Sequence, residues 1–115
     1  MKNLEQIRAA AALPAAHNLS RSAVSKLPAL ILQNGLLATA AFCNAEGGGE
    51  NREGMRTAMN ATAAYLSAQG LLNTGINTVA EMIADLSNRS SHHLQRATTE
   101  ALAFIAYLKR FAPRD

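Results

Sequence analysis

Glu81 and Asp85 are the first candidates for acid–base chemistry in this chain of 115 residues. Because they are four residues apart, both carboxylates would lie on one face of a helix. That face is opposite the apolar residues of the segment, so we expect both carboxylates to face solvent rather than to catalyse. No serine lies in a pattern with a histidine and an acid that predicts nucleophilic catalysis. The sequence predicts a protein that is not an enzyme and that uses no cofactor.

The potential metal ligands are three histidines and one cysteine. His92 and His93 are adjacent, and adjacent residues of a helix point about 100° apart, so one metal ion cannot easily use both. Neither has a carboxylate four residues away, and no paired-cysteine motif is present. Cys43 lies in an apolar stretch, which is typical of a buried thiol. We therefore predict no metal site.

The glycine-rich segment 46–54 invites comparison with a phosphate-binding loop. It lacks the Gly-Lys-Ser/Thr ending of such loops, and no predicted strand precedes it. Its three carboxylates, from Glu46, Glu50 and Glu53, would repel phosphate. We interpret this segment as a flexible loop between helices.

The basic residues have a more informative distribution. The formal net charge is +3, and both ends of the chain are basic whereas residues 46–88 are acidic. Arg96 and Arg110 are separated by two heptads, so they share one stripe of a helix, and Tyr107 lies beside it. Cations along a helix next to a tyrosine can follow a nucleic-acid backbone. A face that is only solvated has the same pattern, and both interpretations stay open on these residues alone.

Apolar residues at helical spacing recur along the chain, whereas strand signals are nearly absent. One domain is expected for a chain of this length. We predict an all-α fold, a compact bundle of about five or six helices. This bundle is predicted to form a single domain over residues 1–115. The helices are predicted to begin near residues 3, 20, 36, 55, 78 and 91.

Prolines and a glycine predict where helices end or bend. Pro14 is predicted to end or kink the first helix, and Pro28 to bend the second. Asn34 with Gly35 forms a stop signal, because glycine readily adopts the left-handed backbone of a helix end. Pro113 is predicted to stop the last helix after residue 112.

The predicted helices also have predicted core residues. The short helix after Gly35 carries Leu37, Ala41 and Phe42. The helices that begin near residues 55 and 91 have core spacing at Met55, Met59, Thr62, Leu66, Leu94, Ala97, Ala101, Phe104, Ile105, Leu108 and Phe111.

We expect a cytoplasmic protein without a membrane segment. Glu5, Arg8 and Pro14 make the alanine-rich opening a poor signal peptide. The uncharged stretch 27–45 is interrupted by the polar residues 33–34 and by Gly35, which argues against a membrane span.

Two segments resemble a known protein family. Residues 26–42 read KLPALILQNGLLATAAF, with a basic residue, Leu-Pro, an Ile, then Asn-Gly-Leu and a Phe. Residues 95–112 read QRATTEALAFIAYLKRFA, with an Arg, Glu-Ala, an aromatic-Leu-Lys-Arg run and a closing Ala. Together with residues 1–9, these segments resemble the small subunit of the type III-B CRISPR effector, the Cmr complex. Residues 46–77 match this family little.

The resemblance implies an all-helical subunit without nuclease activity that takes part in antiviral defence. Copies would stack head to tail as a minor filament beside a filament of backbone subunits that holds the guide RNA. Target RNA would pair with the guide in the channel between the filaments. The implied partners are the other Cmr subunits, especially backbone subunits and neighbouring copies of this chain, together with guide and target RNA.

The resemblance also assigns candidate contact residues. Lys26, Arg96, Lys109 and Arg110 fall within the matching motifs and are assigned to the RNA backbone or to a neighbouring subunit. Arg21 and Arg89 are added as nucleic-acid-binding candidates on charge alone. The remaining motif residues are interpreted as parts of the fold rather than as contacts: Leu27, Pro28, Ile31, Asn34, Gly35, Leu36 and Phe42.

Two other function classes stay open. One is a helical adaptor that makes only protein contacts. The other is a small DNA-binding helical protein, although no typical recognition-helix turn stands out in the sequence. Salt dependence separates RNA binding from protein packing, since phosphate contacts weaken steeply as salt rises.

Overall fold

The computed structural model describes residues 2–114, within which every element of regular structure is helical. The predicted all-α fold class is confirmed. No helix within this range is both long and apolar enough to cross a bilayer. The described helical segments are α1 (Leu4–Ala16), α2 (Arg21–Val24), α3 (Leu27–Asn34), α4 (Leu36–Asn44), α5 (Gly49–Ala68), α6 (Val79–Leu86) and α7 (Ser91–Phe111).

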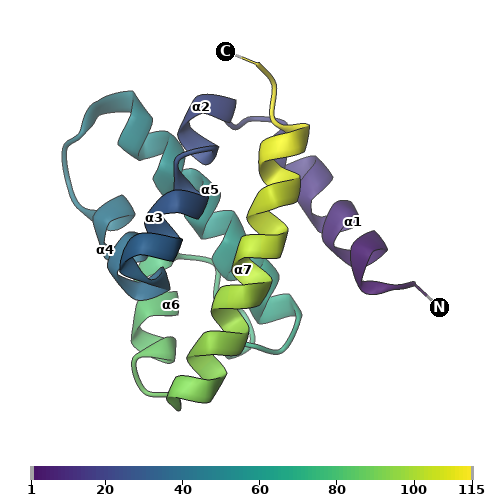
Figure 1. The fold of residues 1–115 in the computed structure, drawn as a ribbon, viewed down its shortest axis with the longest axis vertical. Coiled ribbons are helices and arrows are strands. Elements are labelled where there is room, and N and C mark those ends of the chain that lie inside the picture. The colour runs from purple at the N-terminus through teal and green to yellow at the C-terminus, as the bar shows by residue number, and fades with distance from the viewer. Residues whose placement is uncertain (1, 115) are drawn as a thin grey trace.

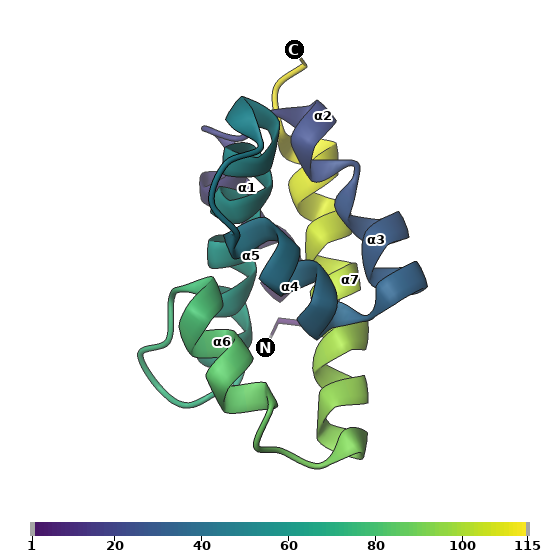
Figure 2. The ribbon, with the colours of Figure 1, turned by 90° about the vertical axis from the view of Figure 1, so that its left-hand side faces the viewer.

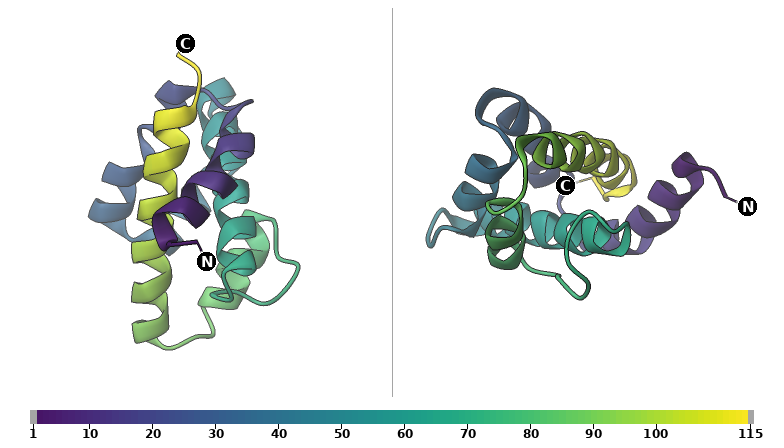
Figure 3. Two further views of the ribbon diagram at one scale, coloured as in Figure 1. Left: turned by 90° about the vertical axis from the view of Figure 1, so that its right-hand side faces the viewer. Right: turned by 90° about the horizontal axis from the view of Figure 1, so that it is seen from below.

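The two longest helices, α5 and α7, form the centre of the molecule (Figure 1). α1 packs along one side of α7, while α2, α3 and α4 lie toward the opposite side (Figures 1 and 3). α6 packs against α4 near the end of the molecule where α7 begins (Figure 2). The Cα radius of gyration is 13.0 Å, as expected for a compact chain of this length.

All seven segments contribute apolar side chains to one core. Tyr65 of α5 and Phe104 of α7 belong to this core and stack, with 4.3 Å between ring centroids and 5° between ring planes. The predicted core positions of α5 and α7 are confirmed: Met55, Met59, Thr62, Leu66, Ala97, Ala101, Phe104, Ile105 and Leu108 are buried, and Leu94 and Phe111 are partly buried.

Two predicted helix boundaries are confirmed by their local geometry. The Gly35 N–H donates to the Ile31 carbonyl oxygen at 2.8 Å, which closes α3. The φ of Gly35 is 91° and its ψ is 161°, a combination open essentially only to glycine. At the other boundary α7 ends at Phe111, two residues before Pro113. Gly35 thus sets the turn between α3 and α4.

The predictions for the other two prolines are partly wrong. α1 continues past Pro14 to Ala16, so of the two outcomes predicted there, an end or a kink, the end does not occur. The single helix predicted from residue 20 to 33 is two helices, because α2 ends at Val24 and α3 begins at Leu27. Pro28 lies in the first turn of α3, where its missing N–H would have no partner in the helix. It therefore starts a helix rather than bending one.

The buried face of α4 also differs from the prediction. Leu36, Thr39, Ala40 and Cys43 are buried, whereas Ala41 is exposed and Leu37 is only partly buried. Phe42 is 43% exposed and lies under the Arg52 guanidinium, which is 4.1 Å from the ring centroid. Because nearly every residue of α4 is apolar, its sequence has no polar face that could fix which side packs inward.

The glycine-rich segment 46–54 is only partly a loop. α5 begins at Gly49, so the loop comprises residues 45–48. Gly54 lies within α5, and a Cβ atom there would come within 2.8 Å of the Ala23 Cβ. Gly54 therefore permits the close approach of α2 to α5, and this packing requirement outweighs its poor helix propensity.

Candidate nucleic-acid interface

α7 presents basic side chains along its solvent-facing side. The helix begins at a Ser90 cap, whose Oγ accepts from the His93 N–H at 3.1 Å. Its core face packs on α1 and α5, and this orientation leaves Arg96, Lys109 and Arg110 exposed. Within residues 2–114 the side chains of these three residues form no ion pair or hydrogen bond. Three cations are thus available on α7 for an anionic partner.

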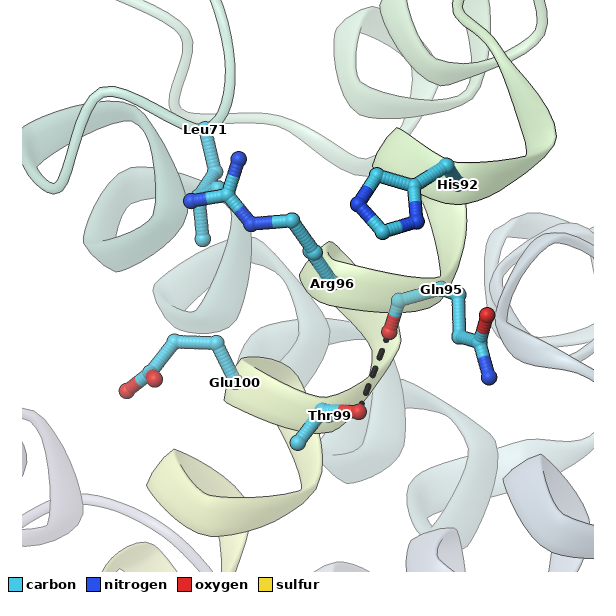
Figure 4. A pocket seen from close by; sticks show the side chains of 6 residues that line it. All are labelled: Leu71, His92, Gln95, Arg96, Thr99 and Glu100. Atoms are coloured by element: carbon cyan, nitrogen blue, oxygen red, sulfur yellow. Dashed lines mark hydrogen bonds between the residues drawn. The ribbon is translucent and has the colours of Figure 1, made fainter.

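Arg96 borders a hollow at the N-terminal half of α7. Its other lining residues are Leu71, His92, Gln95, Thr99 and Glu100 (Figure 4). The side chain of Arg96 extends across the hollow toward Leu71, and the Thr99 hydroxyl donates to the Gln95 carbonyl oxygen at 3.1 Å. A guanidinium over such a hollow can donate two parallel hydrogen bonds to a phosphate.

Lys109 and Arg110 border a second hollow, at the C-terminal half of α7. Arg21, Pro28 and Ala106 complete its lining. Lys26 is exposed and lies at the start of α3, two residues before Pro28. α3 thus meets α7 at this hollow, with Lys26 just before α3 and Lys109 and Arg110 on α7.

Arg21 has a structural role that the sequence did not indicate. Its guanidinium donates to the carbonyl oxygens of Ala112, at 3.0 Å, and Arg110, at 3.1 Å. Carbonyls in the last turn of a helix lack intrahelical donors, and a cation there also opposes the helix dipole. Arg21 therefore caps α7 and ties α2 to its end.

Arg89 also has an internal partner, and the prediction for Asp85 is wrong. Asp85 is only 8% exposed, although it was expected to face solvent. Its oxygens accept from the Arg89 Nε at 2.8 Å and from the Asn73 N–H at 2.7 Å. Burial raises the Asp85 pKa, but the hydrogen bonds from Asn73 and Arg89 outweigh it and leave the pKa below its usual value. This carboxylate fixes the turn after α5.

Sequence analysis missed the polar cluster formed by Arg8, Tyr65 and Glu100. Glu100 of α7 accepts from Arg8 of α1 through both carboxylate oxygens, at 2.6 and 2.8 Å. Its Oε2 also accepts from the Tyr65 hydroxyl of α5 at 2.6 Å. Arg8 and Glu100 are 92 residues apart, so no local pattern could have indicated the contact. We call these three residues the Glu100 clamp.

The Glu100 clamp alters the pKa of each member. The hydrogen bond from Arg8 holds the pKa of Glu100 below its usual value against the effect of burial, and Tyr65 assists. Burial raises the pKa of Tyr65, and the hydrogen bond to Glu100 raises it further. The Glu100 carboxylate is therefore ionised, and the Tyr65 hydroxyl protonated, at neutral pH.

The remaining candidates for chemistry also have structural surroundings. The His93 Nε2 lies 2.7 Å from the Leu71 carbonyl oxygen and donates to it. Cys43 is buried as predicted, and burial raises the pKa of its thiol to about 11. No group of three histidine, cysteine or acidic side chains that could hold a metal ion occurs within residues 2–114.

Comparison with protein families identifies the chain. The model of the family described as CRISPR-associated protein (Cas_Cmr5) matches residues 3–114. The chain belongs to the Cas_Cmr5 family. The resemblance of residues 26–42 and 95–112 to a small Cmr subunit is confirmed. No curated protein and no solved structure matches the chain.

Membership of the Cas_Cmr5 family makes this chain a CRISPR-associated protein of the Cmr type. The match includes residues 46–77, which by their motifs alone show little resemblance to the family. It also includes all seven helical segments described above. The α7 surface and the Glu100 clamp are therefore features of a Cas_Cmr5 chain.

Proposed function

We propose that this chain is a non-catalytic subunit of a Cmr-type CRISPR effector. In this proposal copies stack as the minor filament, contact the backbone subunits, and help to hold guide and target RNA. Family membership supports the association with a Cmr complex. The observation that carries the RNA contact is the set of three exposed cations on α7, none of which has an internal ion pair within residues 2–114.

The geometry of α7 suits an extended strand. Arg96 and Arg110 are separated by two heptads on one helix, which is about 21 Å at 1.5 Å per residue. That span reaches several phosphates of a single strand. Lys26 and Lys109 widen the basic surface toward α3, and Tyr107 offers a partly exposed ring for stacking.

Arg21 and Arg89 take secondary places in this proposal. Their guanidinium groups already bind the end of α7 and Asp85. Any RNA contact from them would use their remaining donors. Arg96, Lys109, Arg110 and Lys26 are the primary candidates.

The absence of catalysis is part of the same proposal. Glu100 is bound by Arg8 and Tyr65, and Asp85 by Arg89 and Asn73. Glu81 accepts from the Thr78 hydroxyl at 2.8 Å at the start of α6. Each of these carboxylates stabilises the fold at its position, which leaves none of them free for metal binding or proton transfer.

A filter-binding titration of target RNA on the assembled effector tests the RNA contact. Arg96→Gln with Arg110→Gln should leave assembly intact and weaken RNA binding roughly tenfold at physiological salt, with a salt slope shallower by about 1.4. The matched control is Asn51→Asp with Gln69→Glu, which removes the same net charge at exposed positions of α5 and its end. This control should bind RNA almost as the unchanged chain does.

The same variant also separates the alternative functions, when the titration is combined with electron microscopy and with competition by duplex DNA. Unchanged RNA affinity with shorter particles in electron microscopy would show that α7 contacts protein, as an adaptor would. Preference for duplex DNA over RNA in competition would favour the DNA-binding alternative. Unchanged assembly with unchanged RNA affinity would show that the α7 cations are only solvated.

A further inference from the structure

A hollow between α1 and α7 differs in chemistry from the basic surface beside it. Its lining residues are Glu5 of α1 and, from α7, Ala103, Ala106, Tyr107 and Arg110. α1 packs along α7 (Figure 3), and the Glu100 clamp ties the two helices together. The volume of the hollow is about 540 Å³, which is within the range of small-ligand sites. We call it the α1–α7 hollow.

The two charged groups of the α1–α7 hollow do not bind each other. Glu5 and Arg110 are exposed side chains of opposite charge that line the same hollow. Neither side chain forms an ion pair or a hydrogen bond with any other group of residues 2–114. The hollow therefore offers a ligand a free acceptor from α1 and a free donor from α7.

Tyr107 gives the α1–α7 hollow an aromatic surface. Its ring is partly exposed and packs against Phe111, with 5.9 Å between ring centroids and 44° between ring planes. Side chains of a helix lean toward its N-terminus, so Tyr107 leans toward Ala103, four residues earlier. Because alanine is small, Ala103 and Ala106 leave room beside the ring for a flat group.

The α1–α7 hollow adjoins the second hollow of α7, which Lys109 borders. Ala106 and Arg110 line both hollows, whereas Arg21 and Lys109 line only the second one. The basic residues of the second hollow suit a phosphate, and a ring beside a carboxylate suits the face and the N–H groups of a base. The two hollows therefore match two parts of one nucleotide, with Arg110 between them.

We propose that the α1–α7 hollow binds the base of an unpaired guanine nucleotide of RNA. The base stacks on Tyr107, its N1–H and N2–H donate to the two carboxylate oxygens of Glu5, and Arg110 donates to its phosphate. Guanine is the one RNA base with two N–H donors side by side on one edge, which a carboxylate can accept together. Watson–Crick pairing uses the same edge, so the bound guanine is unpaired. This inference rests on the proposed function, in which α7 contacts RNA, and names the base that is selected.

The charge of Glu5 has opposite effects on the two parts of a nucleotide. A carboxylate repels every phosphate near it, so its removal favours all RNA alike. At the guanine edge the same charge attracts two N–H groups. Glu5→Gln should therefore raise the affinity for RNA without guanine and remove the advantage of guanine. A Glu5 that serves only in the first turn of α1 would give the first effect without the second.

A nuclear magnetic resonance titration of the purified full chain tests the base preference. The probes are short single-stranded oligouridines that differ only in one central base, which is guanine, adenine, cytosine or uracil. The guanine probe should bind roughly tenfold more tightly than the uracil probe. It should also shift the ring signals of Tyr107 rather than those of the buried Tyr65. Equal affinity for the four probes, or no binding up to about 1 mM, would overturn the proposal.

Glu5→Gln tests the carboxylate against a matched control. Glu50→Gln makes the same change at an exposed residue in the first turn of α5, as Glu5 is in the first turn of α1. Glu5→Gln should reduce the preference for guanine over uracil to less than about twofold, whereas Glu50→Gln should keep it. A Glu5→Gln variant with the full preference, or an equal loss in both variants, would contradict the role of Glu5.

Two substitutions of Tyr107 test the stacking. Tyr107→Leu should weaken binding of the guanine probe roughly tenfold, whereas Tyr107→Phe keeps a ring and should bind it as the unchanged chain does. Circular dichroism should show unchanged helicity for both variants. Equal binding by these two variants would show that no base stacks on residue 107.

The base preference and the RNA contact of α7 can fail separately. Arg96→Gln with Arg110→Gln tests the RNA contact through the total affinity of the assembled effector. The α1–α7 hollow is tested through differences among bases. Equal binding of all four probes would therefore refute the guanine site and leave the proposed RNA contact standing.

Discussion

Glu100 joins three helices through two carboxylate oxygens. Arg8 of α1 binds both oxygens, and the Tyr65 hydroxyl of α5 binds one of them. The side chains of Arg8 and Glu100 are 22% and 14% exposed, so solvent screens the pair less than a surface ion pair. The clamp fixes α1 against α7, and α7 carries the proposed RNA-binding side chains.

Glu100→Gln should destabilise the fold. It removes the charge that Arg8 binds in a partly buried site, which should lower the free energy of unfolding by about 2 kcal/mol. Urea unfolding followed by circular dichroism measures this change. Glu5→Gln is the matched control, because Glu5 is exposed in the first turn of α1 and should cost less than about 0.5 kcal/mol. Equal effects of the two substitutions would contradict the clamp.

Acid should weaken the fold through the same carboxylates. The folded-state pKa values of Glu100 and Asp85 lie below their usual 4.5 and 3.8. Their contribution is therefore fully present above those usual values and is lost as pH falls through the folded-state values. Urea midpoints should be flat above about pH 5 and fall below it. Glu100→Gln should flatten this fall, and a variant with the full acid dependence would count against the assignment.

At the scale of elements, amphipathic helices were predictable and uniform ones were not. α5 and α7 each have one apolar face and one polar face, so their buried residues follow from helical spacing. α4 is apolar on all sides, and its predicted inward residue Phe42 proved exposed. From sequence alone, Pro28 is equally consistent with a bend in a helix and with the start of one. Only tertiary packing decides between these two roles.

Gly54 illustrates why the start of α5 was mistaken for a loop. Glycine disfavours helices, but here it lies where α2 crosses α5, against Ala23. Gly54→Ala gains about 1 kcal/mol of helix propensity. It also overpacks the crossing, so we expect a net loss of about 1–2 kcal/mol in the free energy of unfolding.

The compensating change at Ala23 is the control for this prediction. Ala23→Gly in the Gly54→Ala background removes the clash and should recover part of the loss relative to Gly54→Ala alone. Thermal unfolding of Gly54→Ala, of Ala23→Gly and of the double variant measures this coupling. A stabilised Gly54→Ala single variant would show that the crossing is not tight.

At the scale of the whole molecule, the family and the basic character of α7 were predictable. Which cations bind other parts of the fold and which stay exposed was not predictable. Arg21 and Arg96 look alike in sequence, yet Arg21 caps α7 while Arg96 stands over an open hollow. The distinction arises from contacts between segments about ninety residues apart. The Glu100 clamp escaped prediction for the same reason.

The isolated chain should not cleave RNA. Its partly buried carboxylates, Glu100 and Asp85, are held by arginines. Within residues 2–114 no group of three histidine, cysteine or acidic side chains could hold a metal ion. Labelled RNA incubated with Mg²⁺ or Mn²⁺ should remain intact, with a chelator-treated sample as control. Metal-dependent cleavage that disappears on substitution of one residue of this chain would contradict the non-catalytic role.

The central claim is that α7 contacts RNA within a Cmr-type effector. It is tested most directly by ultraviolet cross-linking of an effector purified from its native cell through a tag on this chain, followed by identification of the RNA-bearing peptides. Our account predicts that backbone subunits and RNA co-purify and that adducts lie on peptides of residues 91–111. Adducts confined to α4, α5 or α6, or a purified assembly without RNA, would contradict it.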